Sequence, residues 1–453
     1  MGPHRELHRH HDVTVLMAAQ TVSELGTQAG LFVLPLITYA LTGSTVLAGL
    51  AGAANLLGTA LAALPGGVLA DRVDRRRLMR TSSALGALSS TSVVVAALLG
   101  ALTVPHLLAA AFVTGGCAGL FAPAEISALR AVVPPHLLPT AIGQQVGRQR
   151  VADLVGAPLG GLLLGLARWA PYVLDAVAYA VAWVTLGRLQ TDLSPSATRR
   201  RGTARADIAE GLRFVWSRPL FRTLMVWSMG SNLVVNALFT AANLRLVRDG
   251  YPAWQIGLVD ASAGVCGVLG ALAAPYVVER FPTGRLTVLV AWSFVPLTLP
   301  LVVLDDPVAV AVALSLGVFL NPAGNGGMGA YKVAVTPAEL VGRVQSVGQL
   351  MAWSTIPLAP VVAGVLLSTV GGAWAVGVLV GLGALVALLP TLVRSVRLVP
   401  RPSEWREQCR TSEADWPGAG GGQRVAPRPQ ARPSPVGPDR RALEPAGAAA
   451  RHP

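Results

Sequence analysis

Twelve long apolar runs divide the sequence, and they restrict its fold more than any other feature. The hydrocarbon core of a bilayer is about 30 Å thick, and a helix needs about 20 apolar residues to cross it. The runs are bounded by charged residues or by glycine and proline clusters, and they cover residues 14–41, 45–69, 79–101, 105–129, 141–167, 171–189, 220–245, 255–278, 286–304, 307–331, 345–369 and 373–393. Their lengths predict twelve transmembrane helices, and therefore an all-α integral membrane protein.

The composition supports a membrane protein and excludes several other classes. Of the 453 residues, 53% are hydrophobic and 13% are charged, whereas soluble domains carry about 25% charged residues. A secreted, fibrous or nucleic-acid-binding protein is excluded, because the arginines behind the net charge of +13 cluster beside the apolar runs. Three cysteines, Cys117, Cys266 and Cys409, are too few for a disulfide framework and suggest no redox or metal role.

Positively charged residues indicate the topology, because cytoplasmic loops of membrane proteins carry an excess of Lys and Arg. With the amino terminus inside, the cytoplasmic side holds Arg72, Arg75, Arg76, Arg77, Arg80, Arg130, Arg199, Arg200, Arg201, Arg205, Arg213, Arg218, Arg222, Arg280, Arg285, Lys332 and Arg343, and the other side holds Arg168, Arg245 and Arg248. An even number of spans places both termini in the cytoplasm. The abundance of Arg over Lys, with much Ala, Gly and Pro, is typical of a GC-rich genome, so we expect a multi-pass protein of a bacterial plasma (inner) membrane.

Shifts in composition predict five segments. They are a cytoplasmic lead (1–12), an N-terminal six-helix bundle (13–189), a cytoplasmic central loop (190–219), a C-terminal six-helix bundle (220–396) and a disordered cytoplasmic tail (397–453). In the central loop, Ile208, Leu212 and Val215 form an apolar stripe at helical spacing, which predicts a short surface helix. The tail is rich in Pro, Arg, Gly and Ala without periodicity, a pattern typical of disorder.

The two predicted bundles are related by an internal repeat. Paired features recur about 200 residues apart: Gln145 and Gln149 with Gln345 and Gln349, Asp71–Arg72 with Glu279–Arg280, and Pro123–Ala124 with Pro322–Ala323. The chain is therefore interpreted as two pseudo-symmetric six-helix halves. Many secondary transporters are built in this way, with the substrate site between the halves near the middle of the membrane.

Polar stripes on otherwise apolar helices predict a central cavity, because a polar face toward lipid is costly. Gln20, Glu24 and Gln28 are four residues apart in the first span, and Asn232, Asn236, Thr240 and Asn243 line the seventh. The candidates for cavity and substrate contacts are Gln20, Gln28, Asn232, Asn236, Gln145, Gln149, Gln349 and Trp353. By contrast, the runs 79–101, 286–304 and 373–393 are almost free of charge, and we expect them to face lipid.

Acidic residues inside the membrane are candidates for proton coupling, because burying a charge there costs at least about 2.5 kcal/mol. Glu24, Glu125 and Asp153 are the candidates, with Glu24 placed in the middle of its polar stripe. A structural alternative exists for two of them, since Asp153 lies near Arg148 and Arg150 and Glu125 lies near Arg130. Asp175 and Asp260 are interpreted as structural, Asp175 because its span is expected to be peripheral.

The segment from Gly67 to Arg77 resembles the loop 2–3 signature of the major facilitator superfamily, in which a glycine precedes Asp71–Arg72 and a basic pair follows. Asp74 stands where the family more often has glycine. Further segments are similar to the branch of macrolide-efflux and siderophore-exporter proteins: Ser23–Gly26, Asp175–Ala176, Asp207–Phe214 and Gly342–Ser346. The resemblance implies the twelve-helix major facilitator fold and gating by Gly67, Asp71, Arg72, Arg76 and Arg77. The alternative for the charged residues is that they only mark the cytoplasmic side of the membrane.

A second motif lies in the fifth span. Gly156, Pro158, Gly160 and Gly161 are similar to a signature of antiporters in this superfamily. The same residues have an alternative interpretation, because small side chains allow helices to pack closely.

We therefore expect a secondary active transporter, a proton-coupled exporter of a small amphipathic drug, natural product or siderophore, working by alternating access. A proton symporter for a small nutrient is the alternative, followed by a non-transporting sensor. No phosphate-binding loop is recognisable, so ATP-driven transport within this chain is not expected. No nucleophile–base pair is recognisable either, so an enzyme is not expected. The expected partners are the substrate, protons and the lipid bilayer, with no nucleic acid. The protein is expected to be a monomer that uses the proton motive force and no cofactor or metal.

Overall fold

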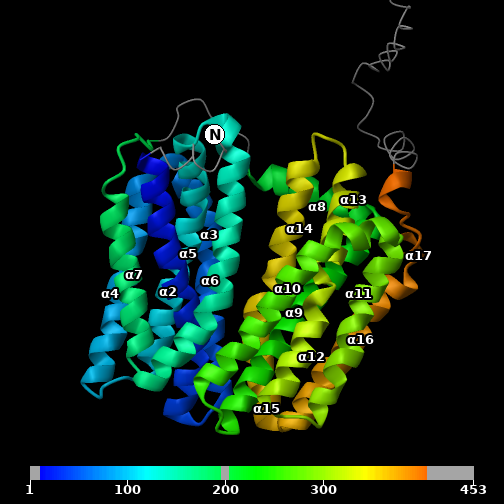
Figure 1. Ribbon diagram of the computed structural model, residues 1–453. Helices are drawn as coiled ribbons and strands as arrows, with labels where there is room; N and C mark the ends of the chain where they lie inside the picture. Colours follow the sequence, from blue (N-terminus) through cyan, green and yellow to red (C-terminus); the bar gives the residue numbers. More distant parts are fainter. Residues whose placement is uncertain (1–10, 195–203, 406–453) are drawn as a thin grey trace, which may run out of the picture.

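A computed structural model describes residues 11–194 and 204–405 of the chain. Within these ranges the regular structure is helical throughout (Figure 1). The first half comprises α2 (His11–Thr42), α3 (Thr45–Arg72), α4 (Arg75–Leu98), α5 (Val104–Val132), the 3₁₀ turn η1 (Pro135–Leu137), α6 (Leu138–Leu166) and α7 (Ala170–Leu186). The all-α fold class is confirmed.

The second half follows α8 (Ala204–Ser217), which connects the halves. It comprises α9 (Pro219–Arg248), α10 (Ala253–Arg280), α11 (Thr283–Thr298), η2 (Leu299–Val302), α12 (Pro307–Phe319), α13 (Asn321–Ala334), α14 (Val341–Ser354), η3 (Ile356–Leu358), α15 (Ala359–Thr369), α16 (Gly372–Leu392), α17 (Arg394–Arg397) and η4 (Pro402–Glu404). Two predicted spans, 307–331 and 345–369, are each broken into two helices. Prolines lie at the start of α13 and in η3, where they remove backbone donors from a continuous helix.

Helix lengths agree with the predicted spans. Ten helical segments in the described part of the chain are long and apolar enough to cross a membrane, and α7 is a shorter apolar helix. The remaining predicted span is α6, which has 29 residues and carries Arg148, Arg150 and Asp153. Apolar side chains such as Leu88 on α4, Leu289 on α11 and Leu385 on α16 are exposed, as lipid-facing positions require.

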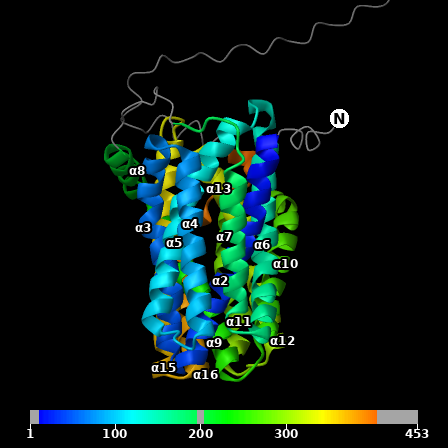
Figure 2. The ribbon, with the colours of Figure 1, turned by 90° about the vertical axis from the view of Figure 1, so that its left-hand side faces the viewer.

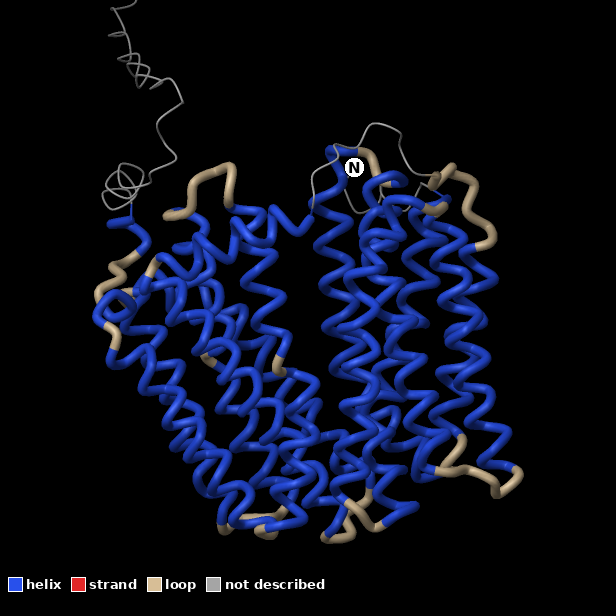
Figure 3. The backbone as a smooth tube through the Cα atoms, turned by 180° about the vertical axis from the view of Figure 1, so that it is seen from behind, coloured by secondary structure: helices blue, strands red, loops and turns tan. Residues whose placement is uncertain are grey.

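The helices form two bundles that meet at one end of the molecule. Figures 1 and 3 show α2–α7 in one group and α9–α16 in the other, converging at the end opposite the start of α2. At this end α3 packs on α15 and α6 packs on α10. Glycines allow this approach: a Cβ at Gly364 would collide with the carbonyl oxygen of Thr45, and one at Gly257 would lie 2.6 Å from the carbonyl oxygen of Ala157. The closed end of the molecule is therefore held by backbone-to-backbone packing.

Within the first bundle, α2 occupies a central position. It packs on α7, α6 and α3, and α4 packs on α5 and α7 (Figure 2). In the second bundle α9 packs on α16 and α15. Separate apolar clusters fill the bundles, one around Leu16 and Met79 in the first and one around Phe214 and Tyr331 in the second. The polar stripe of α2 is thereby placed at the interface between the halves.

Two segments outside the spans differ from their predicted form. The buried face of α8 consists of Gly211, Phe214 and Val215, whereas Ile208 and Leu212 of the predicted stripe are exposed. The predicted apolar stripe is therefore wrong at Ile208 and Leu212. The helix packs through Gly211 instead, where a Cβ would lie 2.9 Å from the carbonyl oxygen of Arg343.

Residues 397–405, assigned above to the tail, pack along the second bundle. Val399 is buried, its carbonyl oxygen accepts a hydrogen bond from the Gly284 amide at 3.0 Å, and Trp405 contacts Tyr331 edge-on. The rest of the predicted tail, the first ten residues with His4, His8 and His10, and the run Arg199–Arg201 lie outside the described residues.

Candidate functional site

A cavity of 350 Å³ lies against the first bundle and collects most of the predicted polar residues. Helices α2, α5 and α6 supply its polar wall, and α4, α7 and α14 contribute one residue each. Eight of its lining residues belong to the predicted set: Gln20, Glu24, Gln28, Glu125, Gln145, Gln149, Asp153 and Trp353. Apolar side chains such as Phe121 and Ile126 line the same space. The cavity therefore offers both polar and apolar surface.

Two further cavities adjoin the first and extend it into the second bundle. One of 310 Å³ shares Gln28 and Asp153 with it and adds Asn236 and Asp260. The other, of 270 Å³, shares Trp353 and is lined by Gln349, Gln345 and Lys332. The three spaces are here called the central cavity. Both halves line the space of 310 Å³, the first bundle and Trp353 line the space of 350 Å³, and the second half lines the space of 270 Å³.

Asn232 differs from the other predicted residues of α9. Its side-chain amide donates to the carbonyl oxygen of Ser228 at 2.9 Å, one turn back along its own helix. Asn236 makes the same kind of bond, to the carbonyl oxygen of Asn232 at 2.8 Å, but Asn236 also lines the cavity of 310 Å³. Asn243 lines this cavity too, and its amide donates to Asp260 at 3.0 Å. Asn232 is therefore engaged with the backbone of α9.

Arg148 contacts two residues that line the central cavity, Gln20 and Glu125, and the sequence reasoning did not single it out. Its guanidinium donates to the carbonyl oxygen of Met17 at 2.9 Å and to Oε1 of Gln20 at 2.6 Å, which joins α6 to α2. It also lies 4.0 Å from Oε1 of Glu125, and Gln145 donates to the same oxygen at 2.7 Å.

The pairing predicted for Glu125 with Arg130 is therefore replaced by a pairing with Arg148. Arg130 lies five residues along α5 and falls outside the three- and four-residue spacings that bring side chains together on a helix. Of the two arginines predicted near Asp153, Arg150 lies 3.4 Å from Oδ2, and Gln28 donates to Oδ1. The second arginine, Arg148, contacts α2 and α5 instead.

Glu24 differs from its acidic neighbours in its hydrogen bonding. It is half-buried on the face of α2 between Gln20 and Gln28, and its carboxylate lines the cavity. Within the described part of the chain, its Oε2 atom is buried and has no hydrogen-bond partner. Glu125 and Asp153 each have a cation within 4.0 Å and an amide donor. Glu24 is thus the acid of the cavity whose charge is least compensated by hydrogen bonds.

The predicted gating loop lies at the open end of the first bundle, between α3 and α4. Asp74 begins α4, where its carboxylate caps the helix by accepting from the Arg76 amide at 2.8 Å, a role that glycine has no side chain to perform. Arg77 is exposed and lies 3.8 Å from Asp74. Asp71 and Arg72 are exposed at the end of α3, and space is open around Gly67.

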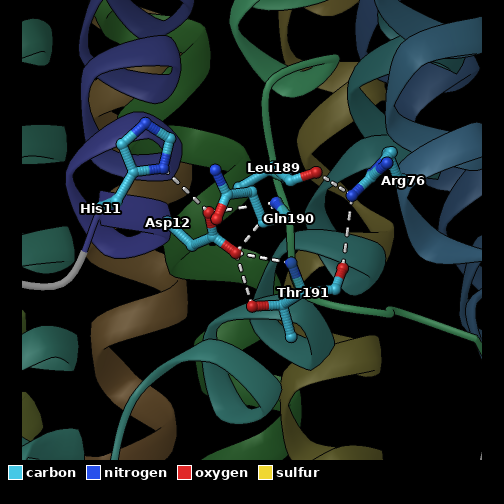
Figure 4. Close-up of polar contacts among 6 residues, drawn as sticks. All are labelled: His11, Asp12, Arg76, Leu189, Gln190 and Thr191. Atoms are coloured by element: carbon cyan, nitrogen blue, oxygen red, sulfur yellow. Dashed lines mark hydrogen bonds and ion pairs between the residues drawn. The ribbon is translucent and has the colours of Figure 1, made fainter.

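Arg76 binds backbone carbonyl groups in the segment that follows α7. Its guanidinium donates to the carbonyl oxygens of Leu189 and Thr191 (Figure 4). The segment 189–191 is also held from the other side by Asp12, whose carboxylate accepts from the Thr191 amide at 2.6 Å and the Thr191 hydroxyl at 2.5 Å. The Gln190 amide donates to both Asp12 oxygens at 3.1 Å. These contacts anchor the start of the connection to the second half, and sequence reasoning missed Asp12.

The glycine and proline motif of α6 lies where α6 contacts two other helices. A Cβ at Gly156 would lie 2.5 Å from Cβ of Gln28, and one at Gly160 would lie 2.7 Å from the carbonyl oxygen of Ala29. Gly161 faces the backbone of Ala253, and Pro158 faces Gly257. The motif thus allows α6 to pack closely on α2 and, across the halves, on α10, as the close-packing interpretation expects.

The sequence of this chain matches a family model and is similar to known proteins. The model described as Major Facilitator Superfamily matches residues 16–356. The chain is 26% identical over 369 residues to the multidrug efflux pump Tap of Mycolicibacterium fortuitum, which covers 79% of this chain and 89% of that protein. It is also 26% identical over 377 residues to the multidrug efflux pump Tap of Mycobacterium tuberculosis (strain ATCC 25618 / H37Rv). This match covers 79% of this chain and 87% of that protein.

Solved structures share the fold. The nucleoside transporter NupG has a TM-score of 0.65 at 12% identity, covering 84% of this chain and 98% of that one. A bacterial homologue of the human lysosomal transporter Spinster, in an inward-facing and unoccupied conformation, has a TM-score of 0.65 at 15% identity, covering 86% and 97%. A D-xylose-proton symporter has a TM-score of 0.63 at 12% identity, covering 87% and 99%. At these identities the likeness establishes the fold alone.

Proposed function

The chain belongs to the Major Facilitator Superfamily, and on that premise we propose that it is a proton-coupled exporter of small amphipathic molecules. The resemblance drawn from the loop after α3 is confirmed, and the chain is a multi-pass membrane transporter rather than an enzyme. Its similarity to multidrug efflux pumps supports export as the direction and drugs as substrates. Natural products and siderophores belong to the proposed substrate class through the resemblance of the sequence motifs alone.

Arginine placement supports an orientation with both termini in the cytoplasm of a bacterial cell. The end of the molecule that carries α8 also carries Arg75, Arg76 and Arg343, and cytoplasmic ends of membrane proteins are rich in such residues. In this orientation the two bundles are closed on the outer side by the glycine contacts of α3 with α15 and of α6 with α10. The structure would then correspond to the form that accepts substrate from the cytoplasm or inner leaflet.

The lining of the central cavity supports an amphipathic substrate. Phe121, Ile126 and Trp353 offer apolar surface, while Gln145 and Gln149 offer amide donors and acceptors. Ligand sites combine such apolar walls with a few polar groups that fix orientation. Because one chain supplies the whole cavity, a monomer suffices for transport.

One observation carries the proposal: Glu24 lines the central cavity, and its buried Oε2 atom has no hydrogen-bond partner in the described residues. An ionised carboxylate in a membrane interior costs at least about 2.5 kcal/mol. Closure of an empty cavity is therefore unfavourable while Glu24 is ionised. Closure becomes favourable when Glu24 is protonated or when a bound substrate compensates its charge. Proton uptake from outside would then bias the empty return step, which couples export to the proton gradient.

Export can be tested in bacterial cells that lack their own multidrug pumps, with ethidium as a fluorescent lipophilic probe. Cells that express the protein should accumulate less ethidium than cells that carry the empty vector, and a protonophore should abolish the difference. Equal accumulation of ethidium and of a panel of lipophilic antibiotics and siderophores, with the protein present in the membrane, would contradict export. Increased, protonophore-sensitive accumulation would favour the symporter alternative.

A further inference from the structure

A second buried carboxyl group lies in the first bundle, behind the central cavity. Asp175 of α7 is 5% exposed and faces a small cavity of 30 Å³ between α2, α3, α4, α5 and α7. Gly26 and Gly30 of α2 lie against it, since a Cβ at Gly30 would be 3.7 Å from its carboxyl carbon. The span that carries Asp175 was predicted to be peripheral, but the residue itself lies in the interior of the bundle. Space for about one water molecule exists beside it.

The hydrogen bonding of Asp175 is incomplete. The Ser90 hydroxyl of α4 lies 2.5 Å from Oδ2. Within the described part of the chain, Oδ1 of Asp175 is buried without a hydrogen-bond partner, and so is the hydroxyl of Tyr172, which lines the same cavity. A buried polar atom without a partner is costly, and native proteins keep such groups rarely.

No cation lines this cavity in the described residues. The titratable groups that face Asp175 are Tyr172 and Tyr179 of its own helix and Cys117 of α5. Helices α2, α3 and α4 present neutral groups: Thr27, Gly30, Asn55, Ser89 and Ser90. A carboxylate buried without a cation or a full set of donors is unfavourable, whereas a carboxylic acid is neutral and can itself donate a hydrogen bond from Oδ1.

We propose that Asp175 is a second proton-binding site of the transporter, loaded with a proton in this conformation. Thr27 and Tyr179 line both the small cavity and the central cavity, so their hydroxyls form the connection through which a proton passes. The face of α2 that carries Gly26 and Gly30 packs on α7, while the face that carries Glu24 lines the central cavity. A shift of α2 during the transport cycle therefore changes the surroundings of both acids together. This proposal deepens the proposed function and rests on it for its role in coupling.

Infrared spectroscopy tests the protonation of Asp175 independently of transport. Purified protein in lipid should show the carbonyl stretch of a protonated carboxylic acid at neutral pH. Asp175→Asn should remove this band and Glu24→Gln should leave it, because the two groups occupy different cavities. Ser90→Ala should move the band to higher frequency, since it removes the hydrogen bond to Oδ2, and the matched control Ser92→Ala should not. If Asp175→Asn does not fold, the band is assigned from the serine variants: it should shift in Ser90→Ala and stay unchanged in Ser92→Ala, and equal behaviour in both would contradict the assignment to Asp175.

A band that is absent from the wild type, or that is lost entirely with Glu24→Gln, would overturn the proposal. Coupling is then measured in liposomes, with ethidium as the probe. Asp175→Asn should keep ethidium–ethidium exchange but lower the number of protons moved per ethidium at least twofold. An unchanged proton-to-ethidium ratio would overturn the role in coupling. Absence of any ethidium flux in the wild type would contradict the proposed function itself, and it would leave the infrared result unaffected.

Discussion

The guanidinium of Arg148 lies 4.0 Å from the carboxylate of Glu125, and it joins α6 to α5 at the wall of the central cavity. Both side chains are nearly buried, at 15% and 10% exposure. Arg148 also donates to two acceptors on α2, so one residue connects three helices of the first bundle. A conformational change that moves α6 relative to α2 must break or remake these contacts.

Removing one partner of this pair should destabilise the protein more than removing both. Arg148→Met leaves a buried carboxylate, and breaking such a pair costs about 3 to 5 kcal/mol, whereas neutral replacement of both partners is often tolerated. We therefore expect the thermal unfolding temperature to fall in Arg148→Met and to recover in part when Glu125→Gln is added. Scanning calorimetry of detergent-purified variants at one heating rate measures this. Additive effects of the two substitutions would show that the groups do not interact.

Glu24→Gln should abolish proton-coupled efflux while the protein remains folded in the membrane. Glutamine keeps the size and polarity of the side chain but cannot release a proton, so the empty return step loses its dependence on pH. Substrate-driven proton flux in liposomes should fall to the level of empty liposomes. Glu404→Gln changes an exposed acid of η4 and should retain wild-type flux. Normal coupled transport by Glu24→Gln would remove Glu24 from the mechanism.

Gly257→Leu should shift the protein away from the conformation described here. A Cβ at this position lies 2.6 Å from the carbonyl oxygen of Ala157 and 2.7 Å from Cα of Pro158, so a larger side chain opposes the close packing of α10 on α6. Overpacking costs about 1 to 3 kcal/mol, enough to change the ratio of two conformations by about 5-fold to 150-fold. Thiol labelling of a cysteine introduced at Gln149, which lines the central cavity, should become slower as the population of the present conformation falls. Gly267→Leu, where space is open, is the matched control.

Asp12→Asn should weaken the anchor at the end of α7. Its carboxylate accepts four hydrogen bonds from Gln190 and Thr191, and a hydrogen bond to a charged group contributes about 1.5 to 3 kcal/mol net. Asparagine keeps one acceptor oxygen, so part of this contribution remains. We expect a loss of about 2 kcal/mol in stability, seen as a lower unfolding temperature. His11→Gln should have a much smaller effect, because His11 is exposed and makes one contact with Asp12 at 3.1 Å. Equal effects of the two substitutions would contradict the assigned role of Asp12.

The sequence could predict features that depend on spacing along one helix. Gln20, Glu24 and Gln28 recur every four residues, so their common face and the cavity beside it follow from helical periodicity alone. The span lengths follow from bilayer thickness in the same way. Even the break in the span after Leu320 is marked in the sequence by Pro322.

Contacts between distant segments could not be predicted in this way. Arg148 lies 128 residues from Gln20, and Thr191 lies 179 residues from Asp12, so no local pattern connects them. Asp175 was interpreted as structural because its helix was expected to be peripheral, whereas α7 in fact packs along α2. Knowing which helices are neighbours is required before a buried acid can be assigned a partner.

Direct measurement of proton movement against substrate movement tests the central claim most sharply. Purified protein is reconstituted in liposomes that contain a pH-sensitive dye, an ethidium gradient is imposed, and the pH inside is followed beside liposomes carrying Glu24→Gln. Antiport predicts protons moving opposite to ethidium in the wild type and no proton movement in the variant. Protons moving in the same direction as ethidium, or identical proton flux in the wild type and in Glu24→Gln, would contradict the account.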